Sequence, residues 1–296
     1  MNSVKKYKED TVMHSKELEA LVFLYEDPDP FVQGKVEERL IEIGEGSVPL
    51  LDEVQSKTSN KEIKERFREL IHSITFGSLE QEFINFLENG VNTLTDLEDG
   101  ILLLTRFDNP TLRTDTYKKM LDQMASEIET EVRYAASPRK QMQILLNLIF
   151  EKKQFTGSSD EFFDPSNSFI NKVLDRKKGI PISLALVVLF LANRLNLPFE
   201  GVNMPMHFLL KFDVEGEKIY IDPFNEGSVI SVDQCLLFLK KSGIKPSASH
   251  FDAASNQEML SRTIRNLING YEKAKDGEKA GQLQRLLGFV DSMVRQ

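Results

Sequence analysis

The chain has 296 residues, of which 41% are hydrophobic and 28% are charged, a composition typical of an ordinary soluble globular protein. Its formal net charge of −9 argues against nucleic-acid binding, which needs a basic face to neutralise phosphates. No run of about 18 apolar residues is present, so neither a membrane span nor a membrane partner is predicted.

The N-terminal stretch MNSVKKYKEDTVMHS has basic residues but no apolar core, so no secretory signal is predicted. Residues 15–76 are predicted to form paired helices. They are separated at Asp27–Pro30, because proline cannot continue a helix but suits the start of the next one. The stretch 24–51 resembles a HEAT-type repeat, with a helix, an Asp/Pro turn, a second helix and a Gly turn. We therefore treat residues 1–76 as a HEAT-like helical block.

The segment 77–165 is predicted to be helical. Its patterns indicate four helices, with the sequences LEQEFINFLEN, LEDGILLLTRF, TDTYKKMLDQMASEIETEV and QMQILLNLIFE. Residues 151–167 carry mixed loop signals. Within this loop we expect Phe162, Phe163 and Pro165 to anchor the chain on the core.

The segment 166–245 is predicted to hold the central part of the molecule. The apolar run Ile182–Ala192 predicts a buried helix over residues 181–195. The pattern then changes to brief apolar stretches separated by turn residues, which predict strands with the sequences FEGVNM, HFLLKF and KIYIDPF. The turn residues Glu215–Glu217 mark a hairpin between the last two, and the sequence VDQCLLFLKK predicts a return to helix.

Residues 246–296 are predicted to form two helices, QEMLSRTIRNLINGYEKA and GEKAGQLQRLLGFVDSMV. The pair resembles one tetratricopeptide-type repeat, although it lacks that repeat's usual signature residues. It is either a capping hairpin or a small interaction platform. Taken together, the patterns predict an α+β fold, mostly helical, with a small antiparallel sheet packed on the helix over residues 181–195.

His207 and Asp222 form the candidate catalytic pair. His207 is predicted on a strand with an alternating pattern, and Asp222 at the end of the next strand. The two are 222 − 207 = 15 residues apart, which is enough for two short strands and one hairpin. Their side chains are therefore expected to be neighbours across the ladder. The alternative is that both residues lie in ordinary turns and share no site.

A buried helix followed by one strand with His and another with Asp resembles the core of transglutaminase-like and papain-like cysteine enzymes. In such cores a cysteine at the helix N-terminus is the nucleophile, because the helix dipole and the His lower its thiol pKa. The acidic residue fixes the tautomer of the His. In this chain Pro181 stands where that cysteine would be.

Two other residues compete for the missing nucleophilic role. Ser183 is the only hydroxyl near the helix start, and it either forms local hydrogen bonds or acts as the nucleophile. Cys235 is predicted to be a buried structural residue on the apolar side of its helix. Because it is the only cysteine, no internal disulfide forms, which indicates a reducing cytoplasm. The four His and one Cys show no metal-ligand spacing, so no metal and no cofactor are predicted.

The sequence FFDPSNSFINKVLDRKKGIPISLALVVLFLANRLNLPFEGVNMPMHFLLKF, followed by YIDPFNEG, resembles the bacterial SirB-type family and the matching domain of certain eukaryotic F-box proteins. The resemblance covers roughly residues 77–290 and leaves the HEAT-like block as an addition. It implies a transglutaminase-like core with a tetratricopeptide-type tail. It also implies a regulatory or interaction role with no established reaction. Met206 departs from the pattern, since the family usually has Gly there. The positions that match are Asn167, Ser168, Arg176, Gly179, Pro181, Ser183, Leu184, Pro205, His207, Phe208, Asp222, Pro223, Phe224 and Gly227.

These observations predict a non-catalytic regulatory or interaction protein of the cytoplasm, which binds protein partners through its helical repeats. The alternative is a hydrolase or acyltransferase that uses Ser183 or a bound water, with His207 as base and Asp222 orienting it. The missing cysteine, the two helical flanks and the acidic surface favour the first interpretation. The sequence specifies neither the partner nor the oligomeric state.

Overall fold

The computed structural model describes residues 16–214 and 216–293. The predictions for residues 1–15 and for Glu215 therefore lie outside the described residues. The described chain is mostly helical with small sheets, so the predicted α+β class is confirmed. Within the described ranges, no helix is long and apolar enough to cross a membrane.

The chain divides into two compact units. The first contains the described residues up to Glu82 together with Arg106–Leu112. The second contains Phe83–Thr105 and the described residues from Arg113 onward. Helix α4 (Lys61–Glu88) contributes residues to both units. Residues 166–245 and the helical tail thus belong to the same unit.

The first unit consists of helices joined by tight turns. They are a helix over residues 16–24, α2 (Pro30–Ile43), a 3-10 turn over Gly44–Ser47, α3 (Val48–Lys57) and the first part of α4. The Asp29 side chain caps α2 by accepting a 2.9 Å hydrogen bond from the Phe31 N–H, and Pro30 occupies the first helical position. Gly44 ends α2 at φ +71°, a backbone conformation that favours glycine. The helix boundaries predicted at the Asp/Pro and Gly turns are confirmed.

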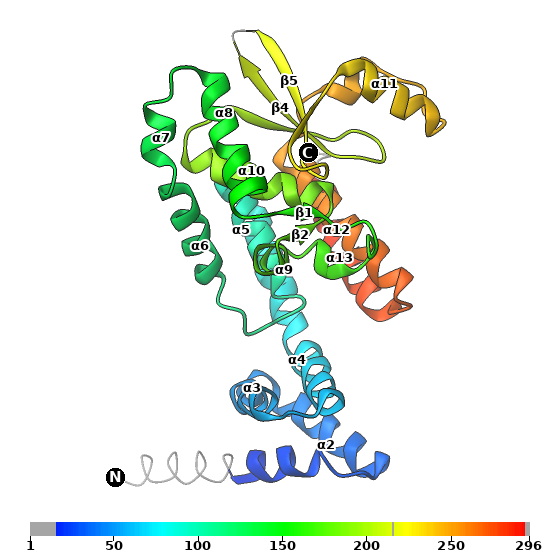
Figure 1. Ribbon diagram of the computed structural model, residues 1–296. Coiled ribbons are helices and arrows are strands. Elements are labelled where there is room, and N and C mark those ends of the chain that lie inside the picture. Colours follow the sequence, from blue (N-terminus) through cyan, green and yellow to red (C-terminus); the bar gives the residue numbers. More distant parts are fainter. Residues whose placement is uncertain (1–15, 215, 294–296) are drawn as a thin grey trace. The chain divides into compact units, whose positions relative to one another are not determined.

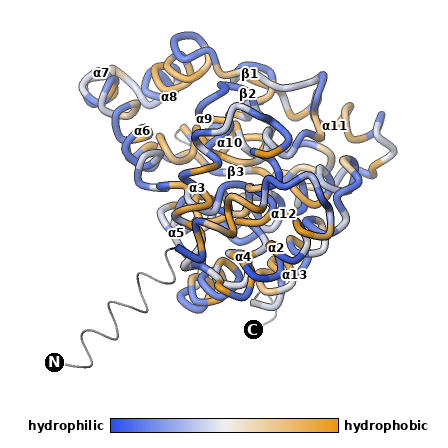
Figure 2. The backbone as a smooth tube through the Cα atoms, turned by 90° about the horizontal axis from the view of Figure 1, so that it is seen from below, coloured by the Kyte–Doolittle hydropathy of each residue, from blue (hydrophilic) through white to orange (hydrophobic). Residues whose placement is uncertain are grey.

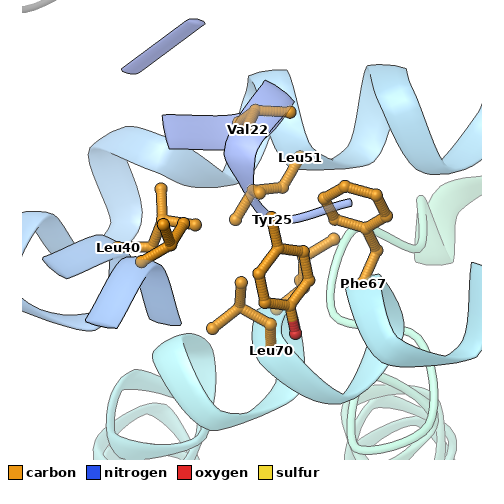
Figure 3. Packing of buried hydrophobic residues seen from close by; sticks show 8 residues of the cluster. Val22, Tyr25, Leu40, Leu51, Phe67 and Leu70 are labelled. Atoms are coloured by element: carbon orange, nitrogen blue, oxygen red, sulfur yellow. The ribbon is translucent and has the colours of Figure 1, made fainter. Parts of the chain in front are cut away.

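One apolar cluster stabilises this unit. Figure 3 shows its side chains converging from successive helices. Leu40, Leu51 and Phe67 are each fully buried, and the Tyr25 ring packs at 5.1 Å from that of Phe67. The Tyr25 hydroxyl reaches the backbone of α4 by donating to the Arg66 carbonyl at 3.3 Å. Each helix thus supplies side chains to a shared core that none of them encloses alone.

The second unit is built around helix α10 (Pro181–Arg194). Twelve of its fourteen residues are buried, from Pro181 to Ala192. Several helices and the strands β3 and β4 contact α10, and Figure 1 shows these elements around it. In Figure 2 the hydropathy colouring marks α10 as an apolar segment. The helices that contact it are α5 (Leu94–Thr105), α6 (Thr114–Ser126), α8 (Pro138–Leu146), α9 (Ile170–Arg176) and α12 (Asn256–Lys273). The predicted central buried helix is confirmed.

A four-stranded antiparallel sheet packs on α10 through β3 and β4. Its strands, in spatial order, are β3 (Phe199–Val202), β4 (Leu209–Val214), β5 (Glu217–Asp222) and β6 (Ser228–Ile230). Leu210 pairs with Ile221, and Gly216 has φ +90° in the turn between β4 and β5. The predicted hairpin is therefore present, and α11 (Val232–Lys241) follows the sheet.

A second, two-stranded pairing lies at the start of α10. Strand β1 (Thr156–Gly157) runs parallel to β2 (Lys178–Gly179), so that Gly157 pairs with Gly179. Before β1 the chain forms a π-helical turn over Asn147–Lys152, which continues α8. This pairing places the residues around Gly157 beside the entry to α10.

The tail forms a helical hairpin of α12 and α13 (Gly277–Met293), as its sequence pattern predicts. Helix α12 also contacts α5 and α10. At Gly270 a side-chain carbon would lie only 2.7 Å from the Phe163 carbonyl oxygen. The tail is therefore packed directly against the core.

Some predicted elements differ from the structure. The helix predicted to end near residue 76 continues to Glu88, because Gly77 does not interrupt α4. The single long helix predicted after Arg113 is two helices, α6 and α7 (Glu129–Arg133). Three residues were predicted to anchor the loop over residues 151–167. Pro165 lies against Gly270 of α12, as predicted, whereas Phe162 and Phe163 are 37% and 51% exposed, so the anchoring predicted for these two rings is wrong.

Candidate functional site

The structure brings His207 and Asp222 together. His207 Nε2 lies 3.0 Å from Asp222 Oδ1, and the two side chains are only 15% and 14% exposed. A carboxylate at this distance accepts the Nε2 proton, which orients the imidazole and leaves Nδ1 for any proton transfer. The pair thus has the geometry of a base held by an acidic residue.

The two residues approach at the edge of the sheet. Asp222 is the last residue of β5, whereas His207 lies in the turn two residues before β4 begins. The expectation that His207 belongs to a strand is wrong, although Leu210 pairs with Ile221 and sets the register that joins them. The His207 N–H donates to the Met204 carbonyl at 3.1 Å, which closes this turn.

Met206, immediately before His207, has φ +64°. This left-handed conformation is easy for glycine and strained for other residues, which explains why glycine suits the position. Met206 is 72% exposed. The departure from glycine therefore adds an apolar side chain to the surface next to His207 in the sequence.

Asp222 also organises the loop that follows it. Its Oδ1 accepts from the backbone N–H groups of Phe224 at 3.0 Å and Asn225 at 3.3 Å. The Gly227 N–H donates to the Asp222 carbonyl at 2.9 Å, and Gly227 has φ +71°. One carboxylate oxygen thus fixes both the imidazole and the turn.

Aromatic rings border the pair on two sides. The Phe224 ring lies 6.4 Å from the His207 ring at 88°, and the Phe238 ring from α11 lies 5.9 Å away at 48°. Phe224 packs directly against Gly157. A side-chain carbon added at Gly157 would lie only 2.6 Å from the carbonyl oxygen of Phe224. Gly157 is therefore required because the Asp222–Gly227 loop passes so closely over β1.

Gly157→Ala should destabilise the protein by about 1–3 kcal/mol and disturb the pair, because the new methyl group collides with backbone that cannot rotate away. Denaturant melts report the stability, and the His207 ring signals in NMR spectra report the site. Gly281→Ala in α13 is the matched control, since nothing lies within 4 Å of its new methyl group. Equal melts and unchanged His207 signals for both variants would contradict this tight packing.

The helix start offers no nucleophile to His207. Pro181 is the first residue of α10. Ser183 is fully buried, accepts from the Ile180 N–H at 3.0 Å and lies 2.6 Å from the Asn167 carbonyl, to which its hydroxyl donates. The structure therefore unites two of the three predicted site residues, His207 and Asp222, whereas the Ser183 hydroxyl forms its hydrogen bonds with backbone groups.

Cys235 lies on α11 and is completely buried in a cluster with Val202, Met204 and Tyr220. Burial raises the pKa of its thiol, and the nearby negative charge of Asp222 raises it further. A raised pKa keeps the group as a neutral thiol at neutral pH. The predicted structural role of Cys235 is consistent with both its burial and its protonation.

Sequence patterns assigned no site role to the aromatic neighbours of the pair. Phe224 appeared only among the positions that match the SirB-type family, and Phe238, which reaches His207 from α11, was not singled out. Within the described parts of the chain, no group of three or more His, Cys, Asp or Glu residues has an arrangement that holds a metal ion.

Comparisons with known proteins place this arrangement in a family. Residues 115–265, just over half of the chain, match the family described as the transglutaminase-like superfamily. No solved structure matches the chain. The matched region runs from α6 to α12 and so contains α10, the sheet and the His207–Asp222 pair.

The relatives include bacterial and animal proteins. A UPF0162 protein of Xylella fastidiosa is 29% identical over 69% of this chain and 76% of its own length. Protein SirB1 of Salmonella typhimurium is 27% identical over 64% of this chain and 71% of its own. F-box only protein 21 of Homo sapiens is 31% identical over 41% of this chain, which corresponds to 20% of that protein. The chain therefore belongs to the transglutaminase-like superfamily, as a member of its SirB-type family.

Proposed function

We propose that this protein is a non-catalytic regulatory protein of the cytoplasm that binds a protein partner through the surface around His207 and through its helical flanks. The observation that carries the proposal is the state of the site: a preserved His–Asp pair without a nucleophile. Covalent acyl transfer needs a nucleophile within hydrogen-bond reach of the base. Pro181 has no nucleophilic group, and the Ser183 hydroxyl forms hydrogen bonds with the Ile180 N–H and the Asn167 carbonyl.

The relatives support a binding role. The region shared with F-box only protein 21 makes up a fifth of that protein, so a related domain also occurs inside a much longer chain. A domain that recurs in different surroundings is suited to recognition. The helices before and after the core supply further surface for the same purpose.

We expect no covalent acyl-enzyme intermediate. Full-length protein treated with a serine-directed fluorophosphonate and with a glutamine-peptide acyl donor should show no added mass, because Ser183 is buried and its hydrogen bonds are made. Iodoacetamide should modify Cys235 slowly at neutral pH, since burial raises its thiol pKa. Intact-mass spectrometry measures all three reactions.

His207→Ala then separates binding from turnover. Under the proposal, this variant weakens capture of a partner by the full-length chain and alters no reaction rate. An adduct on Ser183 or Cys235 that disappears in His207→Ala would instead establish a hydrolase or acyltransferase. Turnover without any adduct, but lost in His207→Ala, would assign the pair to activation of a water.

A further inference from the structure

We propose that Arg262 forms a binding site for a carboxylate group, next to the turn that carries His207. The side chain of Arg262 takes no part in the His207–Asp222 pair. The inference therefore goes beyond the proposed function and does not depend on it.

The Arg262 side chain reaches from α12 to the turn before β4. Its Nη1 donates to the side-chain oxygen of Asn203 and, at 3.1 Å, to the Met204 carbonyl. The His207 N–H donates to that same carbonyl, so the guanidinium and His207 share one backbone acceptor. The guanidinium carbon also lies 5.7 Å from the centre of the Phe208 ring. These contacts hold the guanidinium in one orientation.

One edge of the Arg262 guanidinium remains without partners. Nε–H and one N–H of Nη2 point in parallel from this edge, a spacing that matches the two oxygens of a carboxylate. Neither nitrogen forms a hydrogen bond with any residue that the structure describes. Arg262 is half-buried, and neither nitrogen is among the fully enclosed atoms that lack a partner, so solvent reaches both. A ligand can therefore approach this edge.

No carboxylate of the described residues neutralises Arg262. Glu258, about one helical turn earlier on α12, accepts instead from the Ser255 N–H at 2.7 Å and caps the helix. Asp291 of α13 pairs with Arg265 at 2.8 Å. Burial alone lowers the pKa of the Arg262 guanidinium, so no neighbouring charge offsets its loss of hydration.

A carboxylate is the ligand that this site fits. A partly desolvated cation without an anionic partner reduces stability, because its lost hydration is not replaced. A bound carboxylate supplies two charge-assisted hydrogen bonds and balances the charge. The site contains one cation, which matches the single charge of a carboxylate better than the double charge of a phosphate. Small carboxylic acids and acidic residues of a peptide share this chemistry.

The test uses the full-length protein with ¹⁵N-labelled arginine, in which the Nε–H signal of Arg262 is assigned by its absence from Arg262→Lys. Acetate and a blocked alanine–glutamate–alanine peptide are titrated at constant ionic strength, with the glutamine peptide as neutral counterpart and phosphate as competing anion. A carboxylate should shift the Arg262 signal to saturation, whereas the glutamine peptide should leave it unchanged. Saturation by acetate alone assigns the site to a small acid, and saturation by the glutamate peptide assigns it to an acidic residue.

Arg262→Lys keeps the positive charge but removes the paired donors. Carboxylate binding, followed by the backbone N–H signal of His207, should weaken by about tenfold in this variant. Arg265→Lys is the matched control, since Arg265 lies on the same helix at an exposed position, and it should leave the affinity unchanged.

Three results would overturn the inference: a shift that does not saturate, an equal response to the glutamine peptide, or tighter binding of phosphate. Unchanged affinity in Arg262→Lys would overturn it as well, because the paired donors would then have no role. An acyl adduct on Ser183 would overturn the proposed function and leave this site standing.

Discussion

Leu189→Ala is expected to lower the free energy of unfolding by about 2–5 kcal/mol. Leu189 is fully buried in the middle of α10, with the sheet and several helices packed around that helix. Truncation removes apolar area and leaves a cavity that a close-packed interior fills only partly. Urea melts followed by circular dichroism measure the loss as a fall in the midpoint at unchanged slope.

Leu237→Ala provides the matched control. The same substitution on α11 removes a side chain that is 53% exposed, so the loss should stay within about 1 kcal/mol. A Leu189→Ala loss as small as that of the control would mean that α10 is not the centre of the second unit.

The central helix and the site pair were predictable because their signals are local or short in range. The run Ile182–Ala192 is apolar on every side, and only a buried helix accommodates such a sequence. His207 and Asp222 sit at opposite ends of one hairpin, so the fifteen-residue spacing was enough to bring them together. The absence of a nucleophile at position 181 was also predictable. Proline is favourable at the first position of a helix, but its side chain has no nucleophilic group.

Features that depend on distant contacts were not predictable. Phe162 and Phe163 were expected to anchor their loop on the core, yet both are exposed, and the groups that lie close to Gly270 of α12 are the Phe163 carbonyl and the Pro165 ring. Nothing in the sequence around Phe238 indicates that its ring meets His207 from α11. The Phe224 and Phe238 rings meet at His207 only once the loop after β5, helix α11 and the turn before β4 have folded together.

The turn before β4 shows why one residue type can mislead. Met206 suggests a narrowed site when it is compared with glycine by size alone. The residue instead adopts a positive φ and is 72% exposed, so the replacement of glycine introduces backbone strain at a side chain that is open to solvent. Residue size alone does not reveal this backbone conformation.

Arg194→Ala is expected to cost about 3–5 kcal/mol, the effect of breaking a buried ion pair by removing one partner. The Arg194 guanidinium, at the end of α10, donates two hydrogen bonds to Glu98 at 2.6 and 2.8 Å. It donates a third, at 2.7 Å, to Asp122. The Glu98 side chain is only 6% exposed, so its charge would remain buried without a partner.

Two comparisons isolate this effect in the same urea melts. Arg265→Ala removes an ion pair with Asp291 whose side chains are 52% and 40% exposed, and it should cost no more than about 1 kcal/mol. The double variant Arg194→Met/Glu98→Leu should recover much of the loss, because apolar replacement of both partners leaves no buried charge. If Arg194→Ala were as mild as Arg265→Ala, water would have to reach Glu98, and α5, α6 and α10 would not be held together by this network.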